Sequence, residues 1–220
     1  MLHSFLLHNM KITKGSSEKQ GQFTRLNSQS KMSARILVLS GLCTALTAVG
    51  AFIKIPFYPV PFTLQTLFTA LAALLLPPRW ATLSQAAYLS LGLLGLPVFA
   101  NGGGLGYVMQ PTFGYLLLLP ASACVISTLK SRTRDISLMK VVLILLLGML
   151  MILCGGAVWL YFHIAIILRQ EVSFWHVFYA GVAVFIPSML VKAAVAALFW
   201  QELDKRRPHH TAKRPNIEIF

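Results

Sequence analysis

The residue of this sequence with the clearest potential for chemistry is a lysine inside an apolar segment. Lys192 lies in FIPSMLVKAAVAAL, whereas the acids all fall in tails, connections or helix ends. Burying an unpaired ammonium group is costly, and an ionisable residue at membrane depth usually has a functional partner. Lys192 therefore either meets the carboxylate of a ligand, meets Glu171 folded back over it, or extends to the membrane interface.

Two interrupted stretches provide further candidate groups. KIPFYPVPFTLQTL (54–67) carries three prolines ahead of Thr63 and Gln65, and GLPVFANGGGLGYVMQPTFGYLLLLP (95–120) contains six glycines, three prolines and no charge. Irregular backbone at membrane depth is tolerated only where it is buried in protein or lines a cavity. These stretches therefore predict a binding site. In the alternative interpretation, Thr63 caps a helix and Gln65 is an amide facing lipid headgroups.

Signatures of enzymes are missing from the sequence. It has no GxxxxGK[ST], HExxH or GxSxG motif, and no carboxylate is expected at membrane depth. His163 and His176 are isolated in apolar surroundings, and Cys43, Cys124 and Cys154 lie in different apolar segments without the spacing of metal ligands. We predict that the protein is not an enzyme and needs neither a metal nor a cofactor.

The composition is that of a membrane protein. Of the 220 residues, 56% are hydrophobic and 11% are charged, and the mean hydropathy is +0.70. The formal net charge of +13 raises nucleic acid as a partner. We do not expect it, because the basic residues cluster at the chain ends and in one connection instead of on a folded face. The lipid bilayer is the expected surrounding.

The sequence predicts one membrane domain over residues 32–204. Residues 1–31 are expected to be a disordered tail, or an extension that is not translated if synthesis starts at Met32, and residues 205–220 a basic cytoplasmic tail. About 20 helical residues cross a bilayer. The predicted spans are about Arg35–Ile53, Phe62–Leu76, Trp80–Leu96, Thr112–Leu129, Met139–Leu168 and Pro187–Leu203, with Phe174–Phe185 as an aromatic lead-in at the interface.

Lysine and arginine predict the orientation. Of nineteen such residues, sixteen fall in the two tails, in the connection at Arg79 and in the connection between the fourth and fifth segments. Lys54 and Arg169 lie in the remaining connections. Since basic residues gather on the cytoplasmic side, we predict an all-α polytopic protein of the cell membrane with six transmembrane helices and both termini cytoplasmic. The two interrupted stretches and the buried lysine then share the outer half.

The first segment carries a stripe of small residues. Ser40, Thr44 and Ala48 recur at four-residue spacing, with Gly41 and Ala45 beside them. Small residues let helix backbones approach closely in a membrane. The stripe either packs against a neighbouring helix of the same chain or docks another membrane subunit.

Four motifs, in order, resemble the BioY family, the biotin-binding S components of energy-coupling factor (ECF) vitamin transporters. They are PVPFTLQTL (59–67), GLPVFANGGGLG (95–106), PTFGYLL (111–117) and FIPSMLVKAAVAAL (185–198). The resemblance implies an S-component fold, biotin capture near the outer face, and partnership with a transmembrane coupling subunit and two ATPase subunits, although some members act alone. It also makes the small-residue stripe the contact with the coupling subunit.

The resemblance also implies which residues contact the ligand. In this interpretation Thr63, Gln65 and Asn101 meet the ureido end of biotin, and Lys192 meets its acid end. The family's PGDxxK pattern is here PSMLVK, so the lysine stays and Met189 replaces the aspartate. The full set of predicted contacts is Thr63, Gln65, Tyr88, Phe99, Asn101, Gly103, Gly104, Tyr115 and Lys192.

Three other functions remain open at this point: an S component for another small vitamin, a small intramembrane enzyme, and an assembly subunit. The absence of a carboxylate at membrane depth counts against the enzyme.

Overall fold

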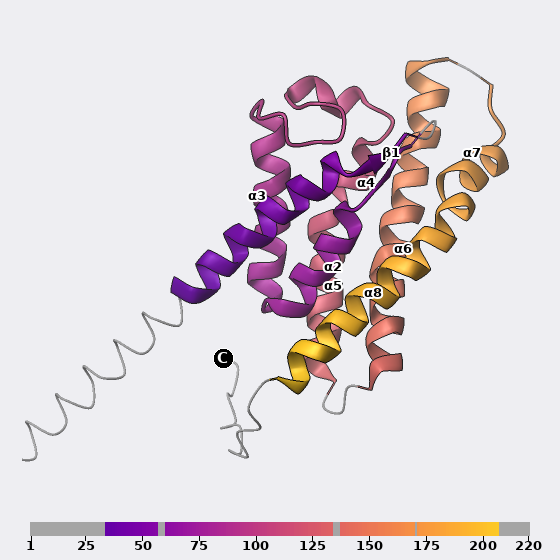
Figure 1. Ribbon diagram of the computed structural model, residues 1–220. Coiled ribbons are helices and arrows are strands. Elements are labelled where there is room, and N and C mark those ends of the chain that lie inside the picture. Colours follow the sequence, from indigo (N-terminus) through magenta and orange to yellow (C-terminus); the bar gives the residue numbers. More distant parts are fainter. Residues whose placement is uncertain (1–33, 57–59, 134–136, 170, 207–220) are drawn as a thin grey trace, which may run out of the picture.

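The computed structural model describes residues 34–56, 60–133, 137–169 and 171–206, which form a bundle of helices (Figure 1). The predicted tail of residues 1–31 and nearly all of the tail of residues 205–220 lie outside these ranges. In chain order, the helices are the first helix Ala34–Phe52, α2 Gln65–Leu75, α3 Pro78–Leu93, the 3-10 helix η1 Leu105–Met109, α4 Phe113–Leu117, α5 Leu119–Arg132, α6 Leu138–Phe162, the π-helix η2 His163–Ile167, α7 Phe174–Gly181, the 3-10 helix η3 Ala183–Phe185 and α8 Ile186–Lys205.

Two short strands connect the first helix to α2. β1 (Lys54–Ile55) pairs antiparallel with β2 (Phe62–Thr63), with Lys54 opposite Thr63. Pro56 and Pro61 have no backbone donor, and a proline disfavours helix at the residue before it, so Lys54–Ile55 and Phe62–Thr63 form strands and not helix. The second span, predicted to begin at about Phe62, begins a few residues later, because Phe62 and Thr63 belong to β2 and α2 begins at Gln65.

Prolines begin three of the helices. Pro78, Pro120 and Pro187 occupy the first turns of α3, α5 and α8, where a missing N–H costs nothing because that N–H would have no helical partner. α6 starts differently, since the Ser137 hydroxyl accepts a hydrogen bond from the backbone N–H of Lys140. Most of the predicted helix starts thus fall within a few residues of these signals.

Four helical stretches are long and apolar enough to cross a membrane. They are Ala34–Phe52, Phe113–Arg132, Leu138–Ile167 and Phe174–Lys205. α2 has 11 residues and α3 has 16, which correspond to about 16 and 24 Å of helix. The predictions of a helical fold and of a multi-pass membrane protein agree with this architecture.

Two predicted segments differ in detail from the structure. The glycine-rich stretch 95–120 is irregular only in its first part, because η1, α4 and the start of α5 lie within it. Residues 174–185, predicted as a lead-in at the interface, form α7 and η3 and run on into α8 as one apolar stretch of 32 residues. α7 packs along α6.

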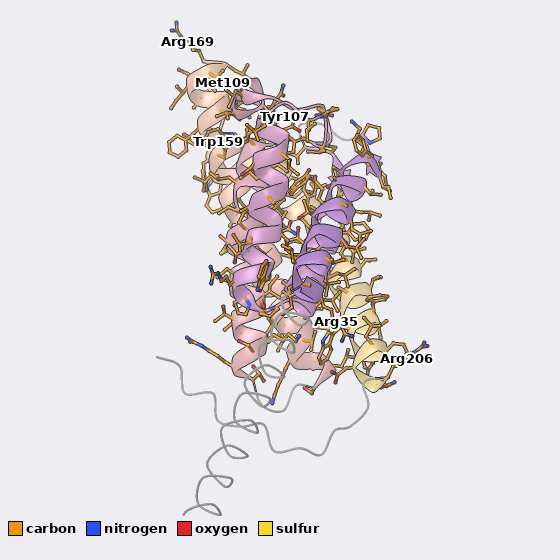
Figure 2. All side chains as sticks on the ribbon, turned by 90° about the vertical axis from the view of Figure 1, so that its left-hand side faces the viewer. Arg35, Tyr107, Met109, Trp159, Arg169 and Arg206 are labelled. Atoms are coloured by element: carbon orange, nitrogen blue, oxygen red, sulfur yellow. The ribbon has the colours of Figure 1, made fainter. Side chains whose placement is uncertain are left out.

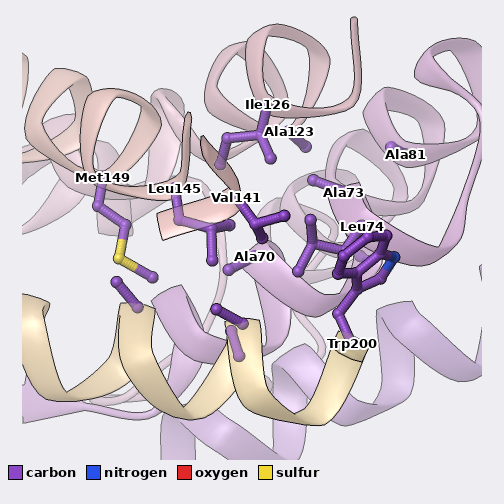
Figure 3. Packing of buried hydrophobic residues seen from close by; sticks show 14 of the residues in the cluster. Ala70, Ala73, Leu74, Ala81, Ala123, Ile126, Val141, Leu145, Met149 and Trp200 are labelled. Atoms are coloured by element: carbon purple, nitrogen blue, oxygen red, sulfur yellow. The ribbon is translucent and has the colours of Figure 1, made fainter. Parts of the chain in front are cut away.

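Small residues fill the core between α2, α3, α5, α6 and α8. Alanines from several helices surround Leu74, Leu145 and Trp200 in this region (Figure 3). At one point the approach is very close, since a Cβ added at Gly148 would lie 2.3 Å from a side-chain atom of Ile126. Close packing replaces the hydrophobic driving force that water would supply to a soluble bundle.

Buried hydrogen bonds join the first helix, α2 and α3. The side chain of Gln85, on α3, accepts from the Thr69 hydroxyl at 2.9 Å and donates to Thr47 at 3.2 Å. The Thr44 hydroxyl reaches the carbonyl of Ser84 at 2.9 Å. These bonds satisfy polar groups inside the bundle and fix how the three helices lie against one another.

The two ends of the bundle differ in charge. Figure 2 shows Arg35 and Arg206 at one end and Tyr107, Met109 and Arg169 at the other. The ammonium group of Lys130 donates to the carbonyl of Leu74, at the end of α2, and lies 5.7 Å from the centre of the Trp200 ring. We call the end with Arg35 and Arg206 the basic end and the end with Tyr107 the loop end.

Candidate functional site

A cavity of about 80 Å³ lies between the hairpin formed by β1 and β2, the glycine-rich stretch 95–120 and helices α2, α4, α5, α6 and α8. This is several times the roughly 10–15 Å³ that holds one water molecule. It contains a few polar groups among apolar walls, the usual composition of a small-molecule site. Its lining residues are Val60, Pro61, Thr63, Gln65, Thr66, Ala100, Tyr107, Thr112, Tyr115, Leu116, Leu119, Met149, Ile152, Leu153, Phe185, Met189 and Lys192.

The cationic wall of the cavity comes from α8. Lys192 is half-buried and lines the cavity together with Met189, which lies one helical turn before it. Within the described part of the chain, Lys192 makes neither a hydrogen bond nor an ion pair with another residue. A cavity with an unpaired ammonium group on one wall is suited to an anionic ligand.

The opposite polar wall is a short chain of hydrogen bonds. The Thr63 hydroxyl donates to Gln65 Oε1 at 3.0 Å, and Gln65 Nε2 donates to the Tyr88 hydroxyl at 2.6 Å. The Tyr88 hydroxyl donates in turn to the carbonyl of Val98 at 3.0 Å. Thr63 and Gln65 line the cavity, while Tyr88 is only 1% exposed and stands behind them.

Tyr115 forms an aromatic wall that close packing holds in place. Its hydroxyl donates to the carbonyl of Gly181 at 3.0 Å. A Cβ at Gly156 would lie 2.2 Å from the Tyr115 ring, and one at Gly181 would lie 2.6 Å from its hydroxyl oxygen. The ring therefore fits between α6 and α7 because both positions lack a side chain.

The glycine-rich stretch covers the cavity at the loop end. Ala100 and Tyr107 contribute lining atoms, and Phe99 supports them from behind with its ring centre 4.6 Å from that of Tyr107. Gly104 has φ +98°, which favours glycine, and a Cβ at Gly103 would lie 2.1 Å from the Leu96 carbonyl oxygen. Burial raises the pKa of the Tyr107 phenol above its ordinary value, which already lies well above neutral pH.

The hairpin and the glycine-rich stretch are joined by Lys54. Its ammonium group, on β1, donates to the Ala100 carbonyl and to Asn101 Oδ1, the latter at 2.9 Å. Ala100 lines the cavity, and Thr63 is the strand partner of Lys54. The bond therefore connects the two segments that flank the cavity at this end.

The structure brings together some of the predicted contact residues and separates others. Thr63, Gln65, Tyr115 and Lys192 line the cavity. The remaining five lie outside the lining and differ in how far they are exposed to solvent. They are Tyr88 and Phe99 (buried), Asn101 and Gly103 (exposed), and Gly104 (half-buried).

Sequence reasoning missed much of the lining. Thr66 and Thr112 lie within two of the quoted motifs, so their hydroxyls could have been added from position alone. Tyr107 sits in the glycine-rich stretch and could have been added in the same way. Met149 and Ile152 face the cavity from the middle of a uniformly apolar helix, where no sequence signal marks one face.

The stripe of small residues divides between two faces of the first helix. Ser40 and Thr44 are buried, and their hydroxyls reach the carbonyls of Trp80 and Ser84 on α3 at 3.4 and 2.9 Å. Ala48 is half-buried. Gly41 and Ala45 are exposed. Part of the stripe thus packs within the chain, and the other part faces outward.

Comparison with known proteins gives consistent matches. The model of the BioY family matches residues 24–209. A probable biotin transporter BioY of Lysinibacillus sphaericus is 40% identical over 180 residues, which cover 82% of this chain and 90% of that protein. The biotin transporter BioY of Thermotoga maritima is 38% identical over 172 residues, covering 78% and 96% of the two chains.

A solved structure has the same architecture. The crystal structure of the S-component for biotin from an ECF-type ABC transporter superposes with a TM-score of 0.71 at 28% sequence identity. The match covers 80% of this chain and 94% of the other. The overall arrangement of the helices is therefore shared with an S-component for biotin.

Proposed function

The chain belongs to the BioY family, and we propose that it is a biotin-capturing S component that takes part in biotin uptake. The observation that carries the proposal is the cavity, which has an ammonium group on one wall, a hydroxyl–amide pair on another and apolar residues between them. Biotin has matching parts: a carboxylate, a ureido ring and an apolar chain with a sulfur-containing ring. The protein is thus a transport subunit and not an enzyme.

In the proposed binding mode, the ligand lies across the cavity between α8 and the hairpin. Its carboxylate meets Lys192, and its ureido group meets Thr63 and Gln65. Tyr115, Met149 and other apolar lining residues contact the rings and the chain. Desolvation in such a cavity strengthens the charge-assisted contact at Lys192.

Asn101, Phe99, Gly103 and Gly104 have a different proposed role. Through its bond to Lys54, Asn101 holds the covering stretch to the hairpin, and Phe99 supports Tyr107. The two glycines allow the stretch to fold tightly over the cavity. These residues then affect access to the site more than contact with the ligand.

We infer that the chain crosses the cell membrane six times, with its basic end in the cytoplasm. In addition to the four long spans, α2 and α3 cross as shorter helices, which places Arg79 with Arg35 and Arg206. The positive-inside rule supports this orientation. The cavity, near the loop end, then opens toward the outside.

Partners are proposed on the same basis. The exposed positions Gly41 and Ala45, beside the exposed Leu37 and Val38, form an unpartnered face of the first helix in the described part of the chain. We propose that this face docks an ECF transmembrane coupling subunit that acts with two ATPase subunits. Small residues there would permit a close helix contact.

The test combines uptake and binding. A biotin auxotroph without its own transporter is supplied with this chain, alone or with coupling and ATPase subunits, and uptake of radiolabelled biotin is measured. The purified chain is titrated with biotin in parallel. We expect saturable binding and rescued uptake, whereas the absence of both would contradict the proposal.

A further inference from the structure

The hydrogen-bond chain from Val98 to Thr63 has a direction, and that direction starts at a carbonyl group. The Val98 oxygen can only accept, so the single proton of the Tyr88 hydroxyl is directed to it at 3.0 Å. The Tyr88 oxygen is then an acceptor. Its neighbour at 2.6 Å, the side-chain amide of Gln65, must present its NH₂ group to it.

The direction continues to the cavity wall. With its nitrogen toward Tyr88, Gln65 turns its oxygen to Thr63, which lies 3.0 Å away and must donate its only proton there. The reversed arrangement, with the Tyr88 proton on the Gln65 oxygen, leaves the Val98 carbonyl without this bond. The first arrangement makes three hydrogen bonds and the reversed one makes two.

We propose that Tyr88 is a positioning residue that fixes the amide of Gln65 and thereby makes the Thr63 hydroxyl an acceptor for an N–H group of the ligand. Tyr88 is buried behind the lining and acts through Gln65, without touching the ligand. The inference rests on the proposed function and deepens it, because it selects ligands that present an N–H group at this wall. A cyclic urea satisfies this requirement.

Removal of the Tyr88 hydroxyl makes the two directions equivalent. In Tyr88→Phe, each orientation of the Gln65 amide keeps one bond to Thr63 and leaves its other group unpaired. Thr63 can then accept from Gln65 and donate its own proton to the ligand. The Thr63 hydroxyl should therefore no longer discriminate between a ligand N–H group and a ligand oxygen.

The probes are biotin and its two cyclic carbamate analogues, in each of which one ureido N–H is replaced by a ring oxygen of similar size. With the wild-type chain, one of the two carbamates should bind about tenfold or more weakly than biotin, since its oxygen would face the Thr63 lone pairs. In Tyr88→Phe, the ratio of the biotin affinity to the affinity for this weaker carbamate should shrink by several-fold. A purely structural role would weaken all three ligands equally and leave the ratio unchanged.

Two further variants complete the test. Ser122→Ala removes another buried hydroxyl that does not line the cavity. This hydroxyl donates to the Gly148 carbonyl at 2.9 Å, and the variant should keep the wild-type ratio. Thr63→Val removes the acceptor itself and should abolish the difference between biotin and the weaker carbamate. It tests whether Thr63 is the discriminating group, and it does so whether or not Tyr88→Phe folds.

The outcomes separate this inference from the proposed function. Biotin binding by the wild type, with an unchanged ratio in Tyr88→Phe or Thr63→Val, overturns the inference and leaves the function intact. A wild-type chain that binds no biotin overturns both.

Discussion

Lys192 and Met189 together define the cationic wall of the cavity. Both line it, and within the described residues no carboxylate pairs with the ammonium group. The family pattern discussed above has an aspartate where this chain has Met189. Because residues three apart share a helix face, that aspartate would stand beside the lysine and compete with a ligand for it. The charge of the ligand should therefore matter more in this chain.

At the residue scale, we predict that biotin binds about 10–100-fold more tightly than its methyl ester, which corresponds to a charge-assisted hydrogen bond of about 1.5–3 kcal/mol. Lys192→Met should abolish the difference, and Met189→Asp should reduce it. Titration of the purified variants with both ligands measures these ratios. Equal affinities of the wild type for acid and ester would refute the prediction.

Close contact between helices shapes the site at the scale of elements. α4 and α6 approach so closely that the Tyr115 ring occupies the place of a side chain at Gly156, and α7 limits the ring from the other side at Gly181. The same glycines thus set both the helix spacing and the position of a cavity wall. Stability and ligand binding are consequently linked at these positions.

We predict that Gly156→Ala destabilises the protein. The added methyl would lie 2.2 Å from the Tyr115 ring, which Gly181 bounds on the other side. Overpacking costs about 1–3 kcal/mol, more than the roughly 0.5–1 kcal/mol that alanine contributes in a helix. Gly41→Ala is the matched control, since apart from its chain neighbours and its own helix backbone no atom lies within 4 Å of the added Cβ. Thermal unfolding in detergent, with and without biotin, should give a lower Tm for Gly156→Ala only. An unchanged Tm would show that the ring has room to shift.

The whole molecule is polarised along the bundle axis. Arg35 and Arg206 mark one end and Tyr107 the other (Figure 2). Tyr107 and Ala100 line the cavity, which therefore reaches the loop end. Toward the basic end, alanines and larger side chains such as Leu74 and Trp200 fill the core (Figure 3), and Met149 belongs both to this core and to the cavity lining. This asymmetry suits a subunit that takes up ligand on one side of a membrane and is docked and moved by partners.

Cysteine labelling tests the proposed orientation. In a background where Cys43, Cys124 and Cys154 are replaced by alanine, single cysteines are introduced as Arg79→Cys, Arg169→Cys and Arg206→Cys, all at exposed positions. A membrane-impermeant maleimide should label Arg169→Cys in intact cells and the other two only after permeabilisation. Labelling of Arg79→Cys from outside would mean that α2 and α3 do not cross.

By itself, the sequence determined the membrane class, most helix positions, the uneven distribution of basic residues and four cavity residues, including Lys192. These features depend on local composition, on proline and glycine, and on motifs, all of which can be read from the amino-acid sequence without knowledge of contacts between distant residues.

Only the tertiary structure decided which faces meet. Met149 and Lys192 line one cavity although they lie on different helices, and an apolar helix has no sequence periodicity that marks its lining face. Two predicted ligand contacts lie outside the cavity lining in the structure: Asn101 is hydrogen-bonded to Lys54, and Tyr88 is buried behind Thr63 and Gln65. The direction of the hydrogen bonds through Gln65 followed from a carbonyl at Val98, which only folding brings within reach of Tyr88.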